Sequence, residues 1–299
     1  MTILLSGASG MLGKAIASRL EDQGNRVLTL VRRRTESADE LSWDPAGAGI
    51  AEPQKLEGLA AAVHLSGANV ASRRWTAAFK REMAESRIQS TRVLSETLAG
   101  LKQPPKVLAA ASAVGFYGDR GDEVLDEDSP AGDGYFPELC QAWEDAARPA
   151  AEAGIRVVHP RFGMVVGRDG GAMARLAPLF RLGLGGRLGS GRQWMSWVAE
   201  EDAASAVVFA LENAAISGAV NVVSPQPVTN AAFTRELGRA VHRPAILPAP
   251  AFALRLAFGA MADEALLASQ RVLPKRLTQA GFAFAYPTLP QALAAVLAK

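Results

Sequence analysis

The glycine-rich segment at residues 6–13, Ser-Gly-Ala-Ser-Gly-Met-Leu-Gly, constrains the fold more than any other part of the chain. It follows a short apolar run, and apolar residues then recur at helical spacing as far as Leu20. This order predicts a strand, a tight turn and a helix, which form the first half of a βαβ unit. Gly7 permits the turn, Gly10 lets backbone N–H groups approach a pyrophosphate, and Gly13 lets the helix pack closely on the strand.

Three consecutive arginines follow the second predicted strand, at residues 26–31. In NAD-binding units an acidic residue near this point bonds the ribose 2′-hydroxyl, whereas arginine suits the 2′-phosphate of NADP. The position favours NADP(H), with Arg32 and Arg33 as the contacts, because a guanidinium donates paired hydrogen bonds to phosphate. A solvated basic loop is the alternative interpretation.

Strand-like and helix-like segments alternate through the first half of the chain. Further strands are expected to end near Asp44 and to cover residues 61–65, 106–111 and 156–159, with helices over 76–101 and 137–153. This alternation predicts an α/β fold with a Rossmann-type, doubly wound parallel sheet covered by helices on both faces. We assign residues 1–165 to this domain, with contributions from about 198–224, and residues 166–299 to a smaller, mostly helical substrate-binding region.

Ligands of such sheets bind beyond the carboxyl ends of the strands. His64 lies inside an apolar run, so it is expected to be packed or hydrogen-bonded rather than catalytic. A later helix is expected at residues 203–211, with Asp202 as its N-cap. The residues expected to hold the cofactor lie at the strand ends and along the glycine-rich segment, and they are Gly7, Ser9, Gly10, Met11, Leu12, Gly13, Arg32, Arg33, Asp44, Leu65, Ser66, Gly67, Ala111 and Phe162.

The composition excludes several other classes of protein. The net charge is only +2, which gives no reason to expect nucleic acid or membrane as a partner. The single cysteine, Cys140, excludes an internal disulfide framework and a cysteine-based zinc site, and no metal is expected. No apolar run approaches the ~18–20 residues that cross a bilayer. A signal peptide is not expected, because Thr2 is the only residue between Met1 and the first predicted strand. We therefore expect a cytoplasmic protein with a small-molecule substrate. The sequence is compatible with a homodimer.

A second glycine-rich stretch, at residues 183–191, precedes Arg192, Trp194 and Trp197. We interpret it as one wall of a substrate pocket that faces the nicotinamide end of the cofactor. A surface loop that its tryptophans anchor to the core is the alternative. Arg87, Arg192 and Trp194 are the candidate substrate contacts, although each can equally be structural.

Several motifs resemble those of extended short-chain dehydrogenases/reductases, the NAD(P)-dependent epimerase/dehydratase superfamily. More narrowly, the chain resembles atypical epimerase-family proteins, some of which are labelled cell-division inhibitors. The resemblance covers essentially the whole chain and implies a Rossmann domain, a C-terminal region that helps form the substrate pocket, and a nicotinamide cofactor. It places Asp44 by the adenine and residues 66–67 along the cofactor. The motifs that carry it are residues 6–13, 64–69 and 112–118 for the superfamily, and 43–45, 74–76, 189–197, 227–230, 250–255, 281–282 and 286–287 for the narrower group.

The catalytic pair of that superfamily, a tyrosine with a lysine four residues later, is absent from this chain. Counting back from Glu144, the pair falls on Phe136 and Cys140, which can neither transfer a proton nor supply a fixed cation. Tyr117 and Tyr135 are therefore the candidate proton donors, and the resemblance suggests that a nearby serine, Ser112, orients the substrate.

Two functions follow from these patterns. The first is an NADP(H)-dependent oxidoreductase or epimerase-like enzyme that acts on a small polar substrate, nucleotide sugars included. An unassisted tyrosine has a pKa near ~10 and donates a proton more readily than it accepts one, which favours reduction. The alternative is an NADP(H)-binding regulatory or redox-sensing protein without turnover.

Overall fold

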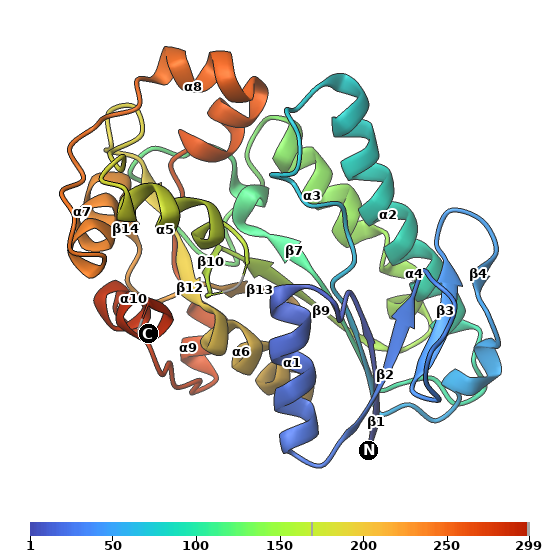
Figure 1. Ribbon diagram of the computed structural model, residues 1–299. Helices are drawn as coiled ribbons and strands as arrows, with labels where there is room; N and C mark the ends of the chain where they lie inside the picture. Colours follow the sequence, from blue (N-terminus) through green and yellow to red (C-terminus); the bar gives the residue numbers. More distant parts are fainter. Residues whose placement is uncertain (169, 298–299) are drawn as a thin grey trace.

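The computed structural model describes residues 1–168 and 170–297 of the chain. Within these residues a nine-stranded sheet forms the centre of the fold (Figure 1), in the order β13-β9-β6-β5-β1-β2-β3-β4, with β7 also paired to β9. The strands are parallel except at the outer edge, where β3 and β4 are antiparallel. This order confirms the expected Rossmann-type α/β fold. The strands are β1 Thr2–Ser6, β2 Arg26–Val31, β3 Glu40–Asp44, β4 Gly49–Ile50, β5 Ala61–His64, β6 Val107–Ala110, β7 Ser112–Ala113, β9 Arg156–Phe162 and β13 Gly218–Val222.

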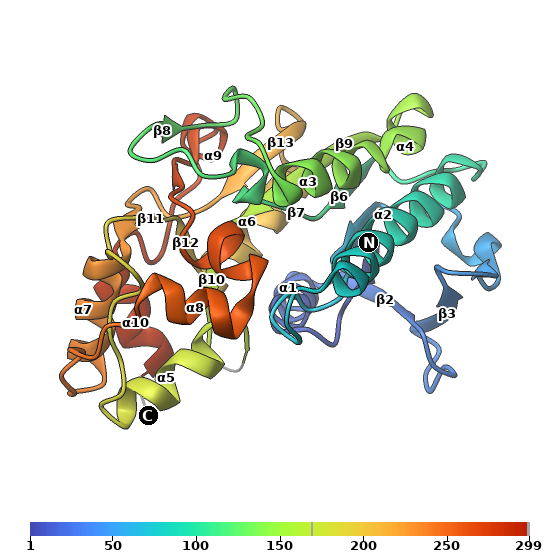
Figure 2. The ribbon, with the colours of Figure 1, turned by 90° about the horizontal axis from the view of Figure 1, so that it is seen from above.

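Alternate side chains of each strand point to opposite faces of the sheet. Ile3 and Leu5 of β1 belong to a core with α1 (Met11–Asp22) and α6 (Glu200–Glu212). Leu4 belongs to the core on the other face, with α2 (Ala77–Ala99) and α4 (Arg148–Glu152). Because both faces are buried, the strands have nearly continuous apolar sequences. Figure 2 shows α2 and α3 together along one side of the sheet.

The C-terminal region packs against one end of this sheet (Figures 1 and 2). Its own core contains the fully buried Trp197 together with Phe233 and Leu293. None of the helices in the described residues combines the length and apolarity needed to cross a membrane. Three two-stranded sheets lie outside the central sheet: β8 Val124–Leu125 pairs with β15 Arg271–Val272, β10 Met164–Val166 with β12 Trp197–Ala199, and β11 Trp194–Met195 with β14 Val228–Thr229. Further helices are α5 Met173–Arg181, α7 Asn230–Ala240, α8 Ala251–Phe258, α9 Lys275–Gln279 and α10 Leu289–Leu297, and a π-helix covers Ala262–Leu266.

The single helix expected over residues 137–153 is in fact two helices, α3 (Tyr135–Asp145) and α4. Pro149 stands in the first turn of α4, where a missing N–H costs no helical hydrogen bond. At the junction the Ser95 hydroxyl donates to the Ala147 carbonyl at 3.0 Å and accepts the Ala150 N–H at 2.8 Å. A side chain from α2 therefore satisfies main-chain groups that the break leaves open.

Asp202 is not the N-cap of α6, because the helix already begins at Glu200. Its buried carboxylate accepts the N–H groups of Ala285 and Tyr286 at 2.7 and 2.9 Å. Burial raises the pKa of Asp202 against the opposing effect of these bonds. The residue fastens the C-terminal chain onto α6, a contact between segments far apart in sequence.

His64 is fully buried in β5, and the expectation of a hydrogen-bonded core histidine is confirmed. Its Nδ1 lies 2.6 Å from the Ser6 hydroxyl oxygen and its Nε2 lies 3.1 Å from that of Ser90. Burial lowers the pKa of the ring to about 3. The neutral ring links β1, β5 and α2 at the carboxyl ends of the two strands.

Replacing His64 by glutamine is expected to flatten the pH dependence of the free energy of unfolding between the ordinary pKa of 6.5 and the folded-state value of about 3. Because the folded-state pKa is depressed, the stability is fully present above pH 6.5 and is lost as the pH falls. The slope from this one group is about 1.4 kcal/mol per pH unit. Urea unfolding across this range measures it. His242→Asn, at an exposed histidine, should retain the native slope, and an unchanged slope in His64→Gln would contradict the prediction.

Candidate functional site

The turn between β1 and α1 has no room for a side chain at two of its glycines. Gly7 has φ +76°, and a Cβ there would lie 2.9 Å from the carbonyl carbon of Leu65. A Cβ on Gly13 would lie 2.2 Å from the Gly7 oxygen and 2.8 Å from the Cα of Ala8. Gly10 is the N-cap of α1 and makes no side-chain cap, so the first N–H groups of the helix face outward for an anion. This cradle fits the pyrophosphate of a dinucleotide.

The parallel sheet brings the ends of neighbouring strands to the same edge. The Leu65 N–H donates to the Ser6 carbonyl at 3.2 Å, and the Ala111 N–H donates to the His64 carbonyl at 2.9 Å. The segment after β5 therefore adjoins the glycine turn, and the segment after β6 adjoins the end of β5. Phe162 ends β9 and packs against the core that contains α1 and α6.

The remaining expected cofactor residues lie around the start of α1 and at the sheet's outer edge. Met11 packs against Gly170: a Cβ added to Gly170 would lie 2.9 Å from the Met11 Cβ. Ser9 is exposed in the turn, and Leu12 is partly buried on α1. Asp44 ends β3, and its carboxylate accepts the Ala46 N–H at 3.0 Å. Contact of these residues with the cofactor stays a prediction.

The two arginines after β2 differ in their surroundings. Arg33 donates from Nη2 to Glu40 Oε1 at 2.7 Å and from Nη1 to Oε2 at 3.1 Å, and Glu36 lies 3.2 Å away. The hydrogen bond with Glu40 raises the pKa of Arg33. Arg32 is exposed and has no polar partner among the described residues. Arg32 is therefore the freer guanidinium for a 2′-phosphate.

Phe136 and Cys140, onto which the sequence comparison predicts that the catalytic pair falls, lie on α3. The Phe136 ring packs edge-on against Trp75, with ring centroids 4.9 Å apart, and lies against Gly115. Cys140 is buried, its Sγ lies 3.7 Å from the Ala113 carbonyl, and burial raises the pKa of the thiol to about 12. Neither residue supplies a proton donor or a fixed cation at neutral pH.

Tyr135, the neighbour of Phe136, is half-buried beside the same aromatic cluster. Its hydroxyl donates to the Lys80 carbonyl at 2.5 Å, and the Lys80 ammonium lies 4.6 Å from the centre of its ring. Burial raises the pKa of Tyr135. The lysine cation therefore lies over the ring, while the hydroxyl is bonded to main chain.

Ser112 and Tyr117 belong to a buried network centred on an ion pair. Arg161 donates to both carboxylate oxygens of Glu144, at 2.7 and 2.8 Å, and to the Tyr117 hydroxyl at 3.1 Å. The Ser112 hydroxyl donates to Glu144 at 2.6 Å, and the Tyr117 hydroxyl donates to Asn221 at 2.8 Å. Tyr117 has no exposed surface, and its pKa is raised by burial. This geometry favours structural roles for both side chains, and their catalytic roles stay predictions.

Arg87, expected to bind substrate, lies beneath the segment that follows β5. It is buried and donates to the carbonyls of Ala68 at 2.9 Å and Met83 at 3.2 Å. Burial lowers its pKa, and its guanidinium lies 5.1 Å from the centre of the Trp143 ring. A Cβ on Gly67 would lie 3.2 Å from this side chain. Arg87 therefore holds the segment after β5 against α2.

The second glycine-rich loop is held by both of its tryptophans. Trp197 is fully buried, and its indole N–H donates to the Gln226 carbonyl at 3.0 Å. The Trp194 indole N–H donates to Asp122 at 2.8 Å, and the Arg271 guanidinium lies 4.4 Å from the centre of the Trp194 ring. These contacts agree with the anchoring alternative. Arg192 is exposed, and substrate contacts of Arg192 and Trp194 stay predictions.

The acidic loop at residues 119–134 has a role that its sequence alone did not indicate. Lys275 donates to Asp126 at 2.9 Å and to Asp128 at 2.7 Å, and Glu127 accepts the Asn221 N–H at 2.9 Å. The hydrogen bond from Lys275 lowers the pKa of Asp126. The loop therefore fastens the sheet domain to the C-terminal region. These interactions could not be read from the sequence, because Asn221 and Lys275 lie far along the chain from the loop.

Comparison with protein families identifies two matching segments. Residues 3–223 match the NAD dependent epimerase/dehydratase family, and residues 249–296 match a domain of unknown function, DUF1731. The first match covers the central sheet and the glycine turn between β1 and α1.

Individual relatives match over nearly the whole chain. Epimerase family protein Mb2239 of Mycobacterium bovis is 46% identical over 291 residues, which cover 97% of this chain and 96% of that protein. The crystal structure of human epimerase family protein SDR39U1 with NADPH is 35% identical and covers 99% of both chains, with a TM-score of 0.92. A nucleoside-diphosphate sugar epimerase from Corynebacterium glutamicum is 34% identical, with a TM-score of 0.82 over 99% of this chain and 58% of that one.

Proposed function

This chain belongs to the NAD-dependent epimerase/dehydratase family, and from that premise we propose that it is an NADP(H)-dependent oxidoreductase or epimerase-like enzyme. Its proposed substrate is a small polar molecule, nucleotide sugars included. The observation that carries the proposal is the glycine turn, where added atoms at Gly7 and Gly13 would meet backbone and where α1 presents uncapped N–H groups. The NADPH in the human relative and the sugar-nucleotide name of the Corynebacterium relative support it.

The proposed roles of the residues follow from their positions at the sheet edge. The N–H groups at the start of α1 bind the pyrophosphate, and Arg32 pairs with the 2′-phosphate. When bound, the nicotinamide supplies or accepts a hydride. Tyr135 protonates the substrate oxygen after giving up its hydrogen bond to Lys80, since a tyrosine with a raised pKa holds its proton until an alkoxide forms. Phe136 and Trp75 exclude water from this side of the site.

NADPH is expected to bind at least about tenfold more tightly than NADH, a difference of about 1.4 kcal/mol. Arg32→Ala should remove most of this preference, whereas Arg33→Ala should remove less because Glu36 and Glu40 already engage that guanidinium. Calorimetric titration of both cofactors into the native protein, the two single variants and the double variant measures the preference. Equal affinities for NADPH and NADH in the native protein would contradict it.

A side-by-side screen tests the proposed enzyme. Carbonyl compounds are tested with NADPH, and alcohols and nucleotide sugars with NADP, in the native protein and in Tyr117→Phe and Tyr135→Phe. We expect reduction that Tyr135→Phe lowers at least about tenfold. Tyr117→Phe should reduce folding stability rather than the chemical step, because its hydroxyl is bonded to Asn221 and Arg161. Turnover that survives Tyr135→Phe unchanged removes this tyrosine from the mechanism.

The alternative function is an NADP(H)-binding regulatory or redox-sensing protein without turnover. One observation favours it: the hydroxyls of Ser112, Tyr117 and Tyr135 each donate to a protein acceptor. Tight NADPH binding without turnover of any substrate in the screen would select this alternative. Mass spectrometry of metabolites that the NADPH-loaded protein retains from a cell extract would then identify a bound ligand.

A further inference from the structure

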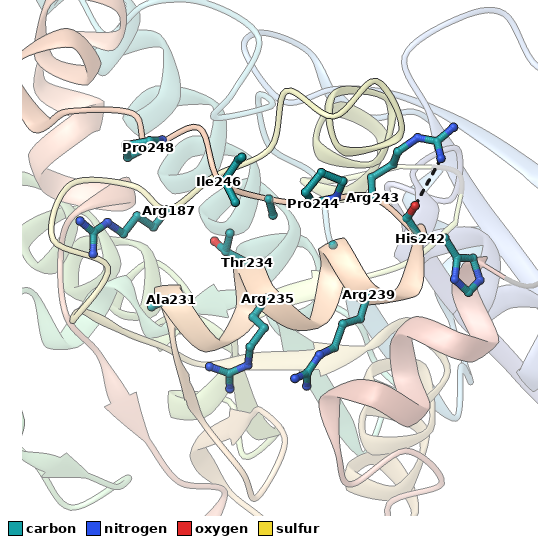
Figure 3. Close-up of a pocket in the computed structure, with 12 residues that line it drawn as sticks. Arg187, Ala231, Thr234, Arg235, Arg239, His242, Arg243, Pro244, Ile246 and Pro248 are labelled. Atoms are coloured by element: carbon teal, nitrogen blue, oxygen red, sulfur yellow. Dashed lines mark hydrogen bonds between the residues drawn. The ribbon is translucent and has the colours of Figure 1, made fainter.

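A groove of about 810 Å³ runs along α7 in the C-terminal region. It shares no residue with the cofactor contacts named above. Ala231, Thr234 and Gly238 of α7 line it on one side, and the extended segment at residues 244–248 lines it on the other (Figure 3). The apolar side chains of that second wall are the exposed Pro244, Ile246 and Pro248 and the partly buried Ala245.

Positive charge is concentrated in this groove, and no acidic residue lines it. Glu236, on the same helix, is shared by Arg235 at 3.3 Å and Arg239 at 2.9 Å. The Arg243 guanidinium donates only to main-chain carbonyls, and the exposed Arg187 guanidinium has no polar partner in the described part of the chain. In a protein of net charge +2, four guanidinium groups that line one groove, with the single carboxylate of Glu236 outside its lining, favour an anionic ligand.

The spacing of the arginines indicates the shape of that ligand. Arg235 and Arg239 are four residues apart on α7, which corresponds to a rise of about 6 Å. Residues i and i+2 of an extended peptide point to the same side and lie about 6.6 Å apart. Two alternate acidic residues can therefore face these two arginines. The residues between them point to the opposite side, where the groove has its proline and isoleucine wall.

The same groove is poorly suited to other modes of binding. A peptide cannot extend the segment at 244–248 as a paired strand, because Pro244 and Pro248 have no N–H and the Leu247 N–H already donates to the Gly185 carbonyl at 3.1 Å. His242 supplies the only aromatic ring among the described residues that line it, and no tryptophan, tyrosine or phenylalanine is there to stack the successive bases of a nucleic acid.

We propose that this groove binds an extended segment of a partner protein in which acidic residues alternate with apolar ones. Charge complementarity with the arginines and apolar contact with the proline wall would supply the affinity. The acidic loop at residues 119–134 of a second copy is not this segment, because Asp126, Glu127 and Asp128 are bonded within their own chain.

Fluorescence anisotropy with short labelled peptides tests the proposal in the full-length protein. The probe alternates glutamate with valine, and three comparison probes are used. These are a peptide of the same composition with its glutamates at one end, a peptide with glutamine for glutamate, and a single-stranded oligonucleotide. The protein variants are Arg235→Gln with Arg239→Gln, and a matched control, Arg92→Gln with Arg148→Gln. The control removes the same charge from exposed positions on α2 and α4.

We expect the alternating peptide to bind most tightly and the groove variant to weaken it at least about tenfold, with the control within about twofold of the native protein. Thermal unfolding of each variant checks that the fold is retained. The proposal is overturned if the alternating peptide does not bind the native protein, if the oligonucleotide or the clustered peptide binds as tightly, or if the control weakens binding as much as the groove variant.

Discussion

Replacing Gly13 by alanine is expected to abolish measurable NADPH binding and to lower the free energy of unfolding by about 3 kcal/mol. The new Cβ would lie 2.2 Å from the Gly7 oxygen, a separation that neither backbone segment can accept without moving. The movement separates the start of α1 from the turn, so the N–H groups that bind the pyrophosphate lose their common direction. Calorimetric titration with NADPH and urea unfolding measure the two effects.

Two other glycines separate the effect on binding from the effect on folding. At Gly10 an added Cβ would lie 3.4 Å from the Gly7 oxygen, so Gly10→Ala should fold with nearly native stability yet bind NADPH more weakly. At Gly100, the C-cap of α2, neighbouring atoms would be 3.6 Å away or more, and Gly100→Ala should change neither property. Native affinity for NADPH in Gly13→Ala would show that this turn does not hold the cofactor.

Replacing Arg161 by methionine is expected to destabilise the protein by about 3–5 kcal/mol. The side chains of Arg161 and Glu144 are only 5% and 14% exposed, so the substitution leaves a carboxylate largely buried without its cation. It also removes the donor to the Tyr117 hydroxyl at 3.1 Å. Urea unfolding at neutral pH measures the loss.

Arg148, a surface arginine on α4, is the matched control. Arg148 lies 3.6 Å from Asp145 and 3.9 Å from Glu152, with its side chain 63% exposed. Arg148→Met should cost less than about 1 kcal/mol, because water screens and replaces such pairs. Adding Glu144→Leu to Arg161→Met should recover part of the lost stability, since no buried charge then remains. An Arg161→Met variant as stable as Arg148→Met would refute the assigned role of the pair.

The parts of the fold that the sequence predicts are those whose signals are local. The β1–turn–α1 unit has an apolar strand, spaced glycines and a helical apolar pattern within about twenty residues. The strands of the parallel sheet are predictable because burial on both faces makes them apolar throughout. His64 was correctly expected to be a core residue because its neighbours on both sides are apolar.

The features that were missed depend on contacts between distant segments. The sequence did not indicate that the Tyr117 hydroxyl bonds to Asn221, 104 residues later. Asp202 looked like an N-cap, but it accepts N–H groups from Ala285 and Tyr286. Local spacing carries no information about such partners.

Some arrangements on the surface were equally hidden in the sequence. The four arginines of the α7 groove come from two segments, which the fold brings together. The predicted NADP contact at Arg33 has carboxylate partners of its own, Glu36 and Glu40, although both lie within seven residues. Their pairing depends on the path of the loop after β2, which charge patterns alone do not specify.

Titration of the purified protein with NADPH, followed by the fluorescence of the reduced nicotinamide, tests the central claim most directly. The native protein should bind NADPH saturably and should bind NADH at least about tenfold more weakly. The Gly13→Ala variant should show no binding of NADPH. Absence of saturable binding in the native protein, or equal binding in Gly13→Ala, would contradict the assignment of the glycine turn to NADP(H).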